Sequence, residues 1–228
     1  MDGLFDRNRE LDQAVVRNIV SLRESQNLFD DLVDNPDEHE LLIAVEMQIK
    51  SDAAPGIITR GFSYSKAIEY PFKTEPFMAS RYSDGTYPVW YGSLDLDTTI
   101  HETAWHMKNE LLCIEGLNEV VIRERAVYHV DCRALLIDIS NKATDYPNLI
   151  SNDYTFTQQI GARIQKEGHP GLLAPSARIV DGINTVIFRE DVLSNPLLNC
   201  YLTYYFNPME SQLKVERTPG KTYLTISY

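Results

Sequence analysis

Several features that would assign this chain of 228 residues to a familiar class of protein are absent. No apolar run approaches the ~20 residues that a membrane-spanning helix needs. The first residues, MDGLFDRNRELDQ, lack the basic and then apolar regions of a secretory signal peptide. These absences predict a cytoplasmic protein that does not enter a membrane.

Cysteine is scarce, with only Cys113, Cys132 and Cys200 and no CxxC pair. The three residues lie far apart, and each stands in an apolar or strand-like context. Disulfide frameworks and zinc sites need paired or clustered cysteines. We therefore expect three buried free thiols in a protein of a reducing compartment.

Basic residues are outnumbered, because 21 Lys and Arg stand against 33 Asp and Glu, for a net charge of −12. They form no stripe or cluster along the sequence. A protein that holds nucleic acid by its phosphates needs such a basic patch, so direct nucleic-acid binding is not expected. The hydrophobic content of 43% and charged content of 24% suit a globular core.

Glycine-rich phosphate-binding motifs and metal-binding motifs are also missing. Neither G-x-G-x-x-G nor G-x-x-x-x-G-K-[ST] occurs, which argues against a Rossmann domain that uses NAD as a hydride carrier. The segment HETAWH resembles a zinc-protease motif, but HExxH needs two histidines four residues apart on one helix face. His101 and His106 are five apart, so their rings diverge by about 140° around a helix. We expect no metal site.

The N-terminal part of the chain shows helical periodicity over residues 4–32, where apolar residues recur at spacings of four and three. These positions are Leu11, Val15, Ile19 and Leu22. Residues 38–50 predict a second helix, and DAAPG at 52–56 marks a boundary. The pattern predicts an N-terminal helical extension over 1–52. This extension could pack on the following domain, act as a lid or mediate self-association into a homo-oligomer.

Residues 53–228 have a different, strand-dominated pattern. Strands are predicted at 57–65 and 88–94, and Trp90 in the second strand is expected in the core because it faces opposite to Tyr91. Helices are predicted at 97–112 and 155–168. Further strands are predicted for EVVIRERAVYHVDCR, ALLIDIS, GLLAP, INTVIFR, CYLTYYF, QLKVE and TYLTIS. The fold class is therefore a mixed, strand-dominated α+β domain over 53–228, preceded by the helical extension.

Three side chains of different chemistry occur within RYSDGTYPVWYGSLDLDTTIHETAWH. Arg81 follows a loop, Tyr91 ends a predicted strand, and Glu102 begins the next predicted helix. Elements adjacent in sequence are usually adjacent in space, so the three could line one cleft. A guanidinium binds phosphates, a tyrosine ring packs on a flat ring, and a carboxylate stabilises a developing sugar cation. The set suits a dinucleotide whose glycosidic bond is broken.

Structural interpretations stand beside these. Thr99 to Glu102 matches the capping box S/T-x-x-E, in which the glutamate only stabilises the helix start. Ser176 follows Pro175 at the end of an apolar strand, where a serine commonly caps its own turn. No G-x-S-x-G elbow surrounds Ser176, so we interpret it as a hydrogen-bonding residue for substrate and not as a nucleophile.

Two ordered blocks of the sequence resemble the RES domain family. The block RYSDGTYPVWYGSLDLDTTIHETAWH resembles the family's Arg-aromatic stretch, its PVLY-like strand and its A/T-x-x-E helix. The block TQQIGARIQKEGHPGLLAPSARIVDGINTVIF (157–188) resembles its helix, its strand ending in PSA and its strand after an Asn. The resemblance covers roughly residues 57–206. It implies catalytic roles for Arg81, Tyr91 and Glu102 and a substrate-binding role for Ser176. Arg60 is a rival to Arg81 as the phosphate-binding arginine, since the family's early strand often carries an Arg. Tyr82, in the loop after Arg81, is also predicted as a substrate-binding residue.

The resemblance also implies a function. Such proteins are similar in fold to ADP-ribosyltransferase toxins, and many are toxins that degrade NAD+ by hydrolysis or phosphorolysis. NAD+ is then the substrate, with no further cofactor, and the expected partner is a helix-turn-helix antitoxin that covers the active site. Transfer of ADP-ribose to a protein is one alternative, and a non-catalytic module that binds a nucleotide is another.

Overall fold

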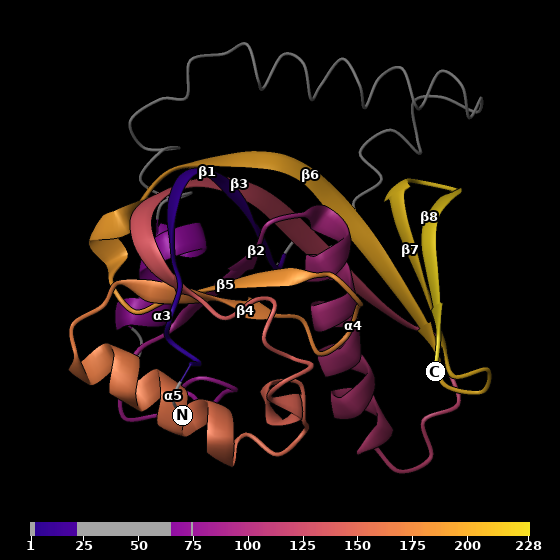
Figure 1. The fold of residues 1–228 in the computed structure, drawn as a ribbon. Helices are drawn as coiled ribbons and strands as arrows, with labels where there is room; N and C mark the ends of the chain where they lie inside the picture. Colours follow the sequence, from indigo (N-terminus) through magenta and orange to yellow (C-terminus); the bar gives the residue numbers. More distant parts are fainter. Residues whose placement is uncertain (1–2, 22–64, 74) are drawn as a thin grey trace.

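The computed structural model describes residues 3–21, 65–73 and 75–228. The described residues form one mixed sheet with the strand order β1-β2-β5-β4-β3-β6-β7-β8, shown in Figure 1. The strands are β1 (Asn8–Val20), β2 (Trp90–Ser93), β3 (Val121–Asp138), β4 (Gly171–Pro175), β5 (Ile183–Ile187), β6 (Leu193–Asn207), β7 (Gln212–Thr218) and β8 (Lys221–Ser227). The predicted strand-dominated α+β class is confirmed.

Helices lie between these strands. The longest are α4 (Leu96–Leu112) and α5 (Thr155–Lys166), and both agree with the predicted helices. Shorter pieces are a π-helical turn (Ser65–Glu69), α3 (Tyr70–Lys73) and two 3₁₀ turns (Pro147–Leu149 and Glu190–Val192). No helix in the described part of the chain is long and apolar enough to cross a membrane.

Five strands close on themselves, because β1 pairs with both β2 and β3 at the two ends of the series β2-β5-β4-β3. A hydrophobic cluster draws buried side chains from all five of these strands. Its members include Leu11, Trp90, Leu136, Leu173 and Ile187. The burial of Trp90, which is 0% exposed, confirms its predicted place in the core.

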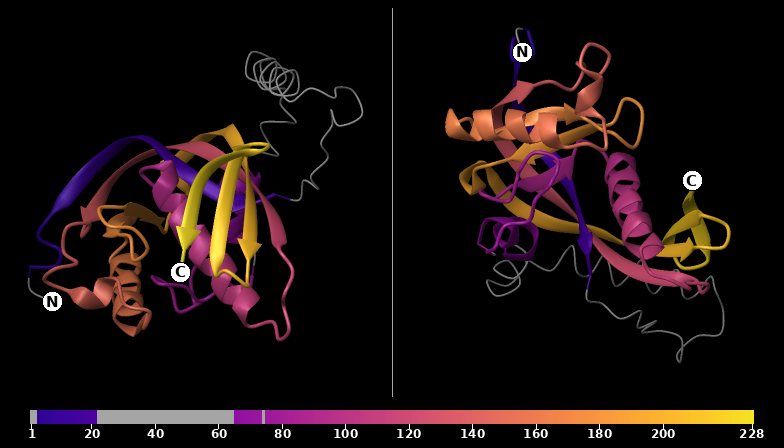
Figure 2. Two further views of the ribbon diagram at one scale, coloured as in Figure 1. Left: turned by 90° about the vertical axis from the view of Figure 1, so that its right-hand side faces the viewer. Right: turned by 90° about the horizontal axis from the view of Figure 1, so that it is seen from below.

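The two long helices cover other faces of the strands. Helix α5 packs Ile160 and Ile164 against β4 and β5, and it lies beneath these strands in Figure 1. Helix α4 packs Ile100, Ala104 and Met107 against a separate cluster from β1, β3, β6 and β7. Figure 2 shows the β7–β8 hairpin beside α4. The candidate site draws residues from α4, from the short strands β2 and β5, and from the segments that precede β2 and follow β4.

The helix predicted over residues 4–32 is wrong for Asn8–Val20, which form β1. Leu11, Val15 and Ile19 are four residues apart, and this even spacing places them on one face of a strand as well as of a helix. The segment forms a strand because it pairs with β3 along its whole length. Its β-branched residues also favour a strand. The predicted helix at 38–50, the boundary at residue 52 and residues 57–64 of the predicted strand lie outside the described residues.

Two further expectations about single elements need correction. The two strands predicted between residues 119 and 140 form one continuous strand, β3. Cys132 and Cys200 are buried free thiols as expected, but Cys113 is exposed because it caps the C-terminus of α4.

Candidate active site

Helix α4 begins earlier than the capping-box interpretation requires. The carboxylate of Asp95 accepts hydrogen bonds from the backbone N and the Oγ1 of Thr98, both at 2.7 Å, so Asp95 is the N-cap. The hydroxyl of Thr99 donates to the carbonyl of Leu96 within the helix. Glu102 is therefore the seventh residue of α4, and the predicted capping box from Thr99 to Glu102 is wrong. Its carboxylate is available for other contacts.

One oxygen of the Glu102 carboxylate is fixed by two donors. Oε1 accepts a hydrogen bond of 2.7 Å from Ser176 Oγ and another of 2.7 Å from Asn184 Nδ2. The amide of Asn184 is held in turn, because its Oδ1 accepts from Ser93 Oγ at 2.7 Å. Oε2 accepts no hydrogen bond from any described residue. The carboxylate is half-buried and oriented, with one oxygen left for a ligand.

Ser176 also organises the turn after β4. Its Oγ accepts from the backbone N of Arg178 at 3.0 Å and of Ile179 at 3.3 Å. The turn closes where the N–H of Ser176 donates to the carbonyl of Gly182 at 2.7 Å. A methyl group at Gly182 would lie 2.8 Å from Thr98 Oγ1 and 3.0 Å from Ser176 Cβ. The structural interpretation of Ser176 as a turn cap is confirmed, and the same hydroxyl also positions Glu102. A direct hydrogen bond from Ser176 to substrate stays a prediction.

Arg81 lies against the loop that precedes α5. Its Nη1 donates to the carbonyl of Ser151 at 2.6 Å and of Leu149 at 3.2 Å. The guanidinium carbon lies 4.6 Å from the centroid of the Tyr154 ring, a cation–π contact. Nη2 is buried and has no hydrogen-bond partner in the described part of the chain. One side of the guanidinium is therefore satisfied by the protein and the other is not.

Tyr91 holds the loop that carries Arg81. Its hydroxyl accepts from the backbone N of Tyr82 at 2.9 Å and shares a hydrogen bond of 2.9 Å with Ser80 Oγ. Burial raises the pKa of Tyr91, against the two hydrogen bonds, which lower it. The hydroxyl thus fixes the residues on both sides of Arg81, while the ring itself is only partly buried.

The same loop is fixed from its other side by α5. Gln158 Nε2 donates to the carbonyl of Ser80 at 3.0 Å and of Ser83 at 3.3 Å. Tyr82 is 1% exposed and packs in the core beneath α5. Its backbone carbonyl accepts from the Tyr87 hydroxyl at 2.7 Å. The side chain of Tyr82 is therefore a packing residue of the core, and its buried hydroxyl has no hydrogen-bond partner among the described residues. Its predicted role in substrate binding stays a prediction.

Arg178 joins the site although the sequence did not suggest it. Its guanidinium carbon lies 3.4 Å from the centroid of the Trp105 ring, and its Nη1 donates to Asn152 Oδ1 at 2.9 Å. Burial lowers the pKa of Arg178, and the charge of Arg81 lowers it further, whereas the carboxylate of Glu102 raises it. These mutual effects place the two guanidiniums and the carboxylate in one electrostatic neighbourhood. In the sequence, Arg178 is the last residue of the PSAR segment at 175–178, two positions after the predicted Ser176.

The structure thus brings together Arg81, Tyr91, Glu102 and Ser176, and it adds Asn184 and Arg178. Arg60 lies outside the described residues. His101 and His106 lie on α4, and no group of three His, Cys, Asp or Glu among the described residues could hold a metal ion.

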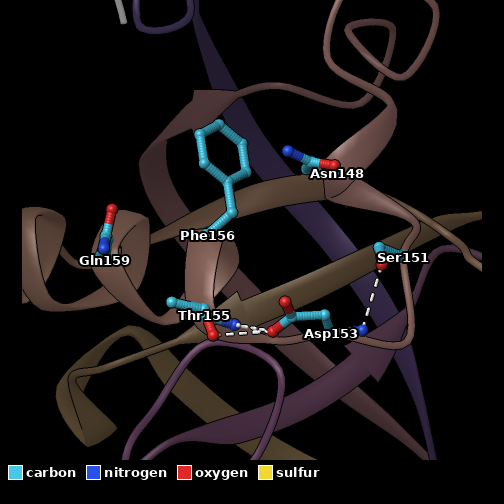
Figure 3. Close-up of a pocket in the computed structure, with 6 residues that line it drawn as sticks. All are labelled: Asn148, Ser151, Asp153, Thr155, Phe156 and Gln159. Atoms are coloured by element: carbon cyan, nitrogen blue, oxygen red, sulfur yellow. Dashed lines mark hydrogen bonds between the residues drawn. The ribbon is translucent and has the colours of Figure 1, made fainter.

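A hollow of about 260 Å³ lies beside this site, on the loop that Arg81 and Arg178 contact. Figure 3 shows the six residues that line it: Asn148, Ser151, Asp153, Thr155, Phe156 and Gln159. The carboxylate of Asp153 accepts from the backbone N and the hydroxyl of Thr155 at 2.9 and 2.7 Å. Asp153 N donates to Ser151 Oγ at 3.1 Å. These local bonds shape the loop that presents the carbonyl of Ser151 to Arg81.

The sequence matches the RES domain over residues 55–207, and the chain belongs to the RES domain family. This confirms the family indicated by the two sequence blocks. No curated protein matches the chain. One similar solved structure is a chain of the M. tuberculosis MbcT–MbcA toxin–antitoxin complex, at 13% identity and a TM-score of 0.44 over 88% of this chain and 91% of that one.

Proposed function

We propose that this protein cleaves the bond between nicotinamide and ribose in NAD+, by hydrolysis or phosphorolysis, and acts as a toxin that depletes NAD. The observation that carries the proposal is the Glu102 carboxylate, whose Oε1 is fixed by Ser176 and Asn184 while Oε2 is left for a ligand. A carboxylate held in this way is suited to a positive charge that develops in front of it. Membership of the RES domain family supports the same reaction.

The chemistry follows from the leaving group. Nicotinamide departs with the electron pair of the glycosidic bond, and positive charge develops on the anomeric carbon and the ring oxygen of the ribose. Oε2 of Glu102 stabilises this charge and accepts a hydrogen bond from a ribose hydroxyl. Water or phosphate then forms the new bond to the anomeric carbon and releases a proton. The products are nicotinamide with ADP-ribose or with ADP-ribose phosphate.

Other side chains orient the substrate. Arg81 binds the diphosphate through the Nη2 that no described residue occupies. The partly buried ring of Tyr91 packs near the nicotinamide, and its hydroxyl keeps the loop of Arg81 in place. Ser176 and Asn184 act on the substrate through Glu102. In a toxin of this family the partner is an antitoxin protein that covers the site.

Nicotinamide release from NAD+ tests the proposal, measured by chromatography with and without phosphate. Glu102→Gln keeps the shape of the side chain and removes the charge, so we expect a loss of at least about 100-fold in rate with the fold retained. Glu110→Gln is the matched control, since Glu110 lies on the same helix, is exposed and pairs with Arg123. It should leave the rate unchanged.

The same assay separates the alternatives. Full activity of a folded Glu102→Gln protein would contradict the proposal. Label from adenine-labelled NAD+ that appears on a macromolecule would indicate ADP-ribosyl transfer to a protein. Nucleotide binding without nicotinamide release would indicate a non-catalytic binding module. A phosphate requirement for release would identify phosphorolysis.

A further inference from the structure

Two buried guanidinium nitrogens near Glu102 have no hydrogen-bond partner in the described part of the chain. They are Nη2 of Arg81 and Nε of Arg178. A buried donor that lacks a partner costs about 1–3 kcal/mol, and a charged donor costs more. Such a donor calls for an explanation, and a bound ion or ligand is one of those known. For two cationic donors near one carboxylate, a ligand would be an anion.

Three contacts with neutral groups hold Arg178 in position. Its backbone N donates to Ser176 Oγ at 3.0 Å, which ties it to the residue that orients Glu102. The guanidinium stacks on Trp105 at 3.4 Å, and Trp105 lies one turn beyond Glu102 on α4. Its Nη1 donates to the neutral amide of Asn152 at 2.9 Å. Stacking on an aromatic ring fixes a guanidinium in the planar orientation that bidentate phosphate binding needs.

The two arginines also repel each other. The charge of Arg81 lowers the pKa of Arg178 by more than the carboxylate of Glu102 raises it, so a further anion between the two guanidiniums would relieve the repulsion. Both donate Nη1 to neutral oxygens of the same loop, Arg81 to Ser151 and Leu149 and Arg178 to Asn152. Neutral oxygens are weaker partners for a guanidinium than the charged oxygens of a phosphate.

We propose that Arg178 and Arg81 bind the diphosphate of the substrate together, and that Arg178 sets the preference for a substrate with phosphate beside the scissile ribose. The inference rests on the proposed function and deepens it. A nucleoside with the same glycosidic bond but no phosphate gains nothing from Arg178. The residue therefore decides between phosphorylated and unphosphorylated forms of one substrate.

The test compares NAD+ with nicotinamide riboside, which has the same scissile bond and no phosphate. Arg178→Gln should lower kcat/KM for NAD+ by about 10- to 100-fold, mainly through KM, because a charge-assisted hydrogen bond is lost. The same variant should lower kcat/KM for nicotinamide riboside by a much smaller factor, because that substrate has no phosphate for Arg178 to bind. Arg178→Lys keeps the charge without the planar fork, so its kcat/KM for NAD+ should lie between those of the wild type and Arg178→Gln. Arg189→Gln, at an exposed arginine that pairs with Asp191, is the matched control.

A purely structural role for Arg178 gives a different result. If Arg178 only held the loop through Asn152, both substrates would be affected equally, and Asn152→Ala would reproduce the loss. Either result would overturn the inference. Equal KM values for NAD+ in wild type and Arg178→Gln would overturn it as well.

A binding measurement distinguishes this inference from the proposed function. Titration calorimetry with ADP-ribose compares the Glu102→Gln protein with the Glu102→Gln, Arg178→Gln protein, and we expect binding at least about 10-fold weaker in the second. If wild type releases no nicotinamide but this difference persists, the proposed function fails and the arginine pair stands. If ADP-ribose does not bind, or binds both proteins equally, the arginine pair fails.

Discussion

The hydroxyl of Tyr91 lies between the two residues that flank Arg81, since it accepts from Tyr82 N and shares a hydrogen bond with Ser80 Oγ. Tyr91→Phe keeps the ring and removes these bonds. The buried N–H of Tyr82 then has no partner, so we expect a loss of about 1–3 kcal/mol in the free energy of unfolding, measured in urea. Because Arg81 loses its support, KM for NAD+ should rise more than kcat falls.

The exposed Tyr70 provides the control for this variant. Tyr70→Phe removes a hydroxyl from an exposed tyrosine and should change neither stability nor KM. A Tyr91→Phe protein that loses stability but keeps the wild-type KM would mean that the loop does not depend on this hydroxyl to place Arg81.

At this scale the sequence could identify residue types but not their partners. Glu102 and Ser176 were both predicted, and they form one hydrogen bond of 2.7 Å across 74 positions of the chain. Asn184 was noted only as the Asn of a strand in the second sequence block, and its role was missed because it arises only when β5 pairs beside β2. Arg178 was missed because its direction depends on Trp105 and Asn152, which come from two other segments.

Helix α5 approaches the Arg81 loop more closely than any side chain would allow. A methyl group at Gly161 would lie 1.9 Å from the carbonyl oxygen of Tyr82 and 2.9 Å from the Tyr87 hydroxyl. Alanine stabilises a helix interior by about 1 kcal/mol relative to glycine, so propensity alone favours Gly161→Ala. We expect the opposite, a loss of about 1–3 kcal/mol from overpacking, together with lower kcat/KM as the loop moves.

Ala162→Gly is the matched control on the same helix, because Ala162 is exposed. It should cost about 1 kcal/mol by propensity and leave activity unchanged. Thermal or urea unfolding measures the stability of both variants, and nicotinamide release from NAD+ measures their activity. A Gly161→Ala protein more stable than wild type would show that α5 can shift away from the loop.

The elements themselves were predictable to different degrees. The helices at α4 and α5 were predicted to within two residues because their apolar faces have helical periodicity. The strand β1 was predicted as a helix because apolar residues four positions apart share one face in a helix and also in a strand. Only the pairing of β1 with β3 distinguishes the two structures. The capping box at Thr99 was wrong because Asp95 and Thr99 are both acceptable caps, and the structure shows Asp95 as the N-cap.

Across the whole molecule, the order of strands could not be predicted. The closure of five strands depends on β3, which pairs with β1, β4 and β6 through long-range contacts that leave no local pattern. The β7–β8 hairpin lies beyond the family match at residue 207, yet it contacts α4. Tyr223 donates to Asp97 at 2.8 Å, and Lys108 lies 4.1 Å from the Tyr228 ring centroid. The hairpin thus supports the helix that carries Glu102.

The hairpin also makes the stability of the molecule depend on pH through Glu216. This carboxylate is 5% exposed and pairs with Lys214 at 2.6 Å, and it accepts from Gly220 N at 2.9 Å and the Tyr205 hydroxyl at 3.3 Å. Burial is the largest influence and raises the pKa of Glu216, but Lys214 and the hydrogen bonds together lower it below the ordinary value. A lowered pKa in the folded state gives stability that is present above the unfolded-state pKa of about 4.3 and is lost as pH falls through the folded-state value.

Urea unfolding from pH 7 to pH 3 measures this contribution by comparing wild type with Glu216→Gln. Wild type should be the more stable protein at pH 7, and the difference in free energy of unfolding should narrow as pH falls below about 4.5, because protonated Glu216 resembles glutamine. Glu210→Gln, at an exposed site in the turn between β6 and β7, controls for the loss of one negative charge. A difference between wild type and Glu216→Gln that stays constant from pH 7 to pH 3 would show that the charge of Glu216 does not hold the hairpin. Acid would then destabilise the protein through other carboxylates.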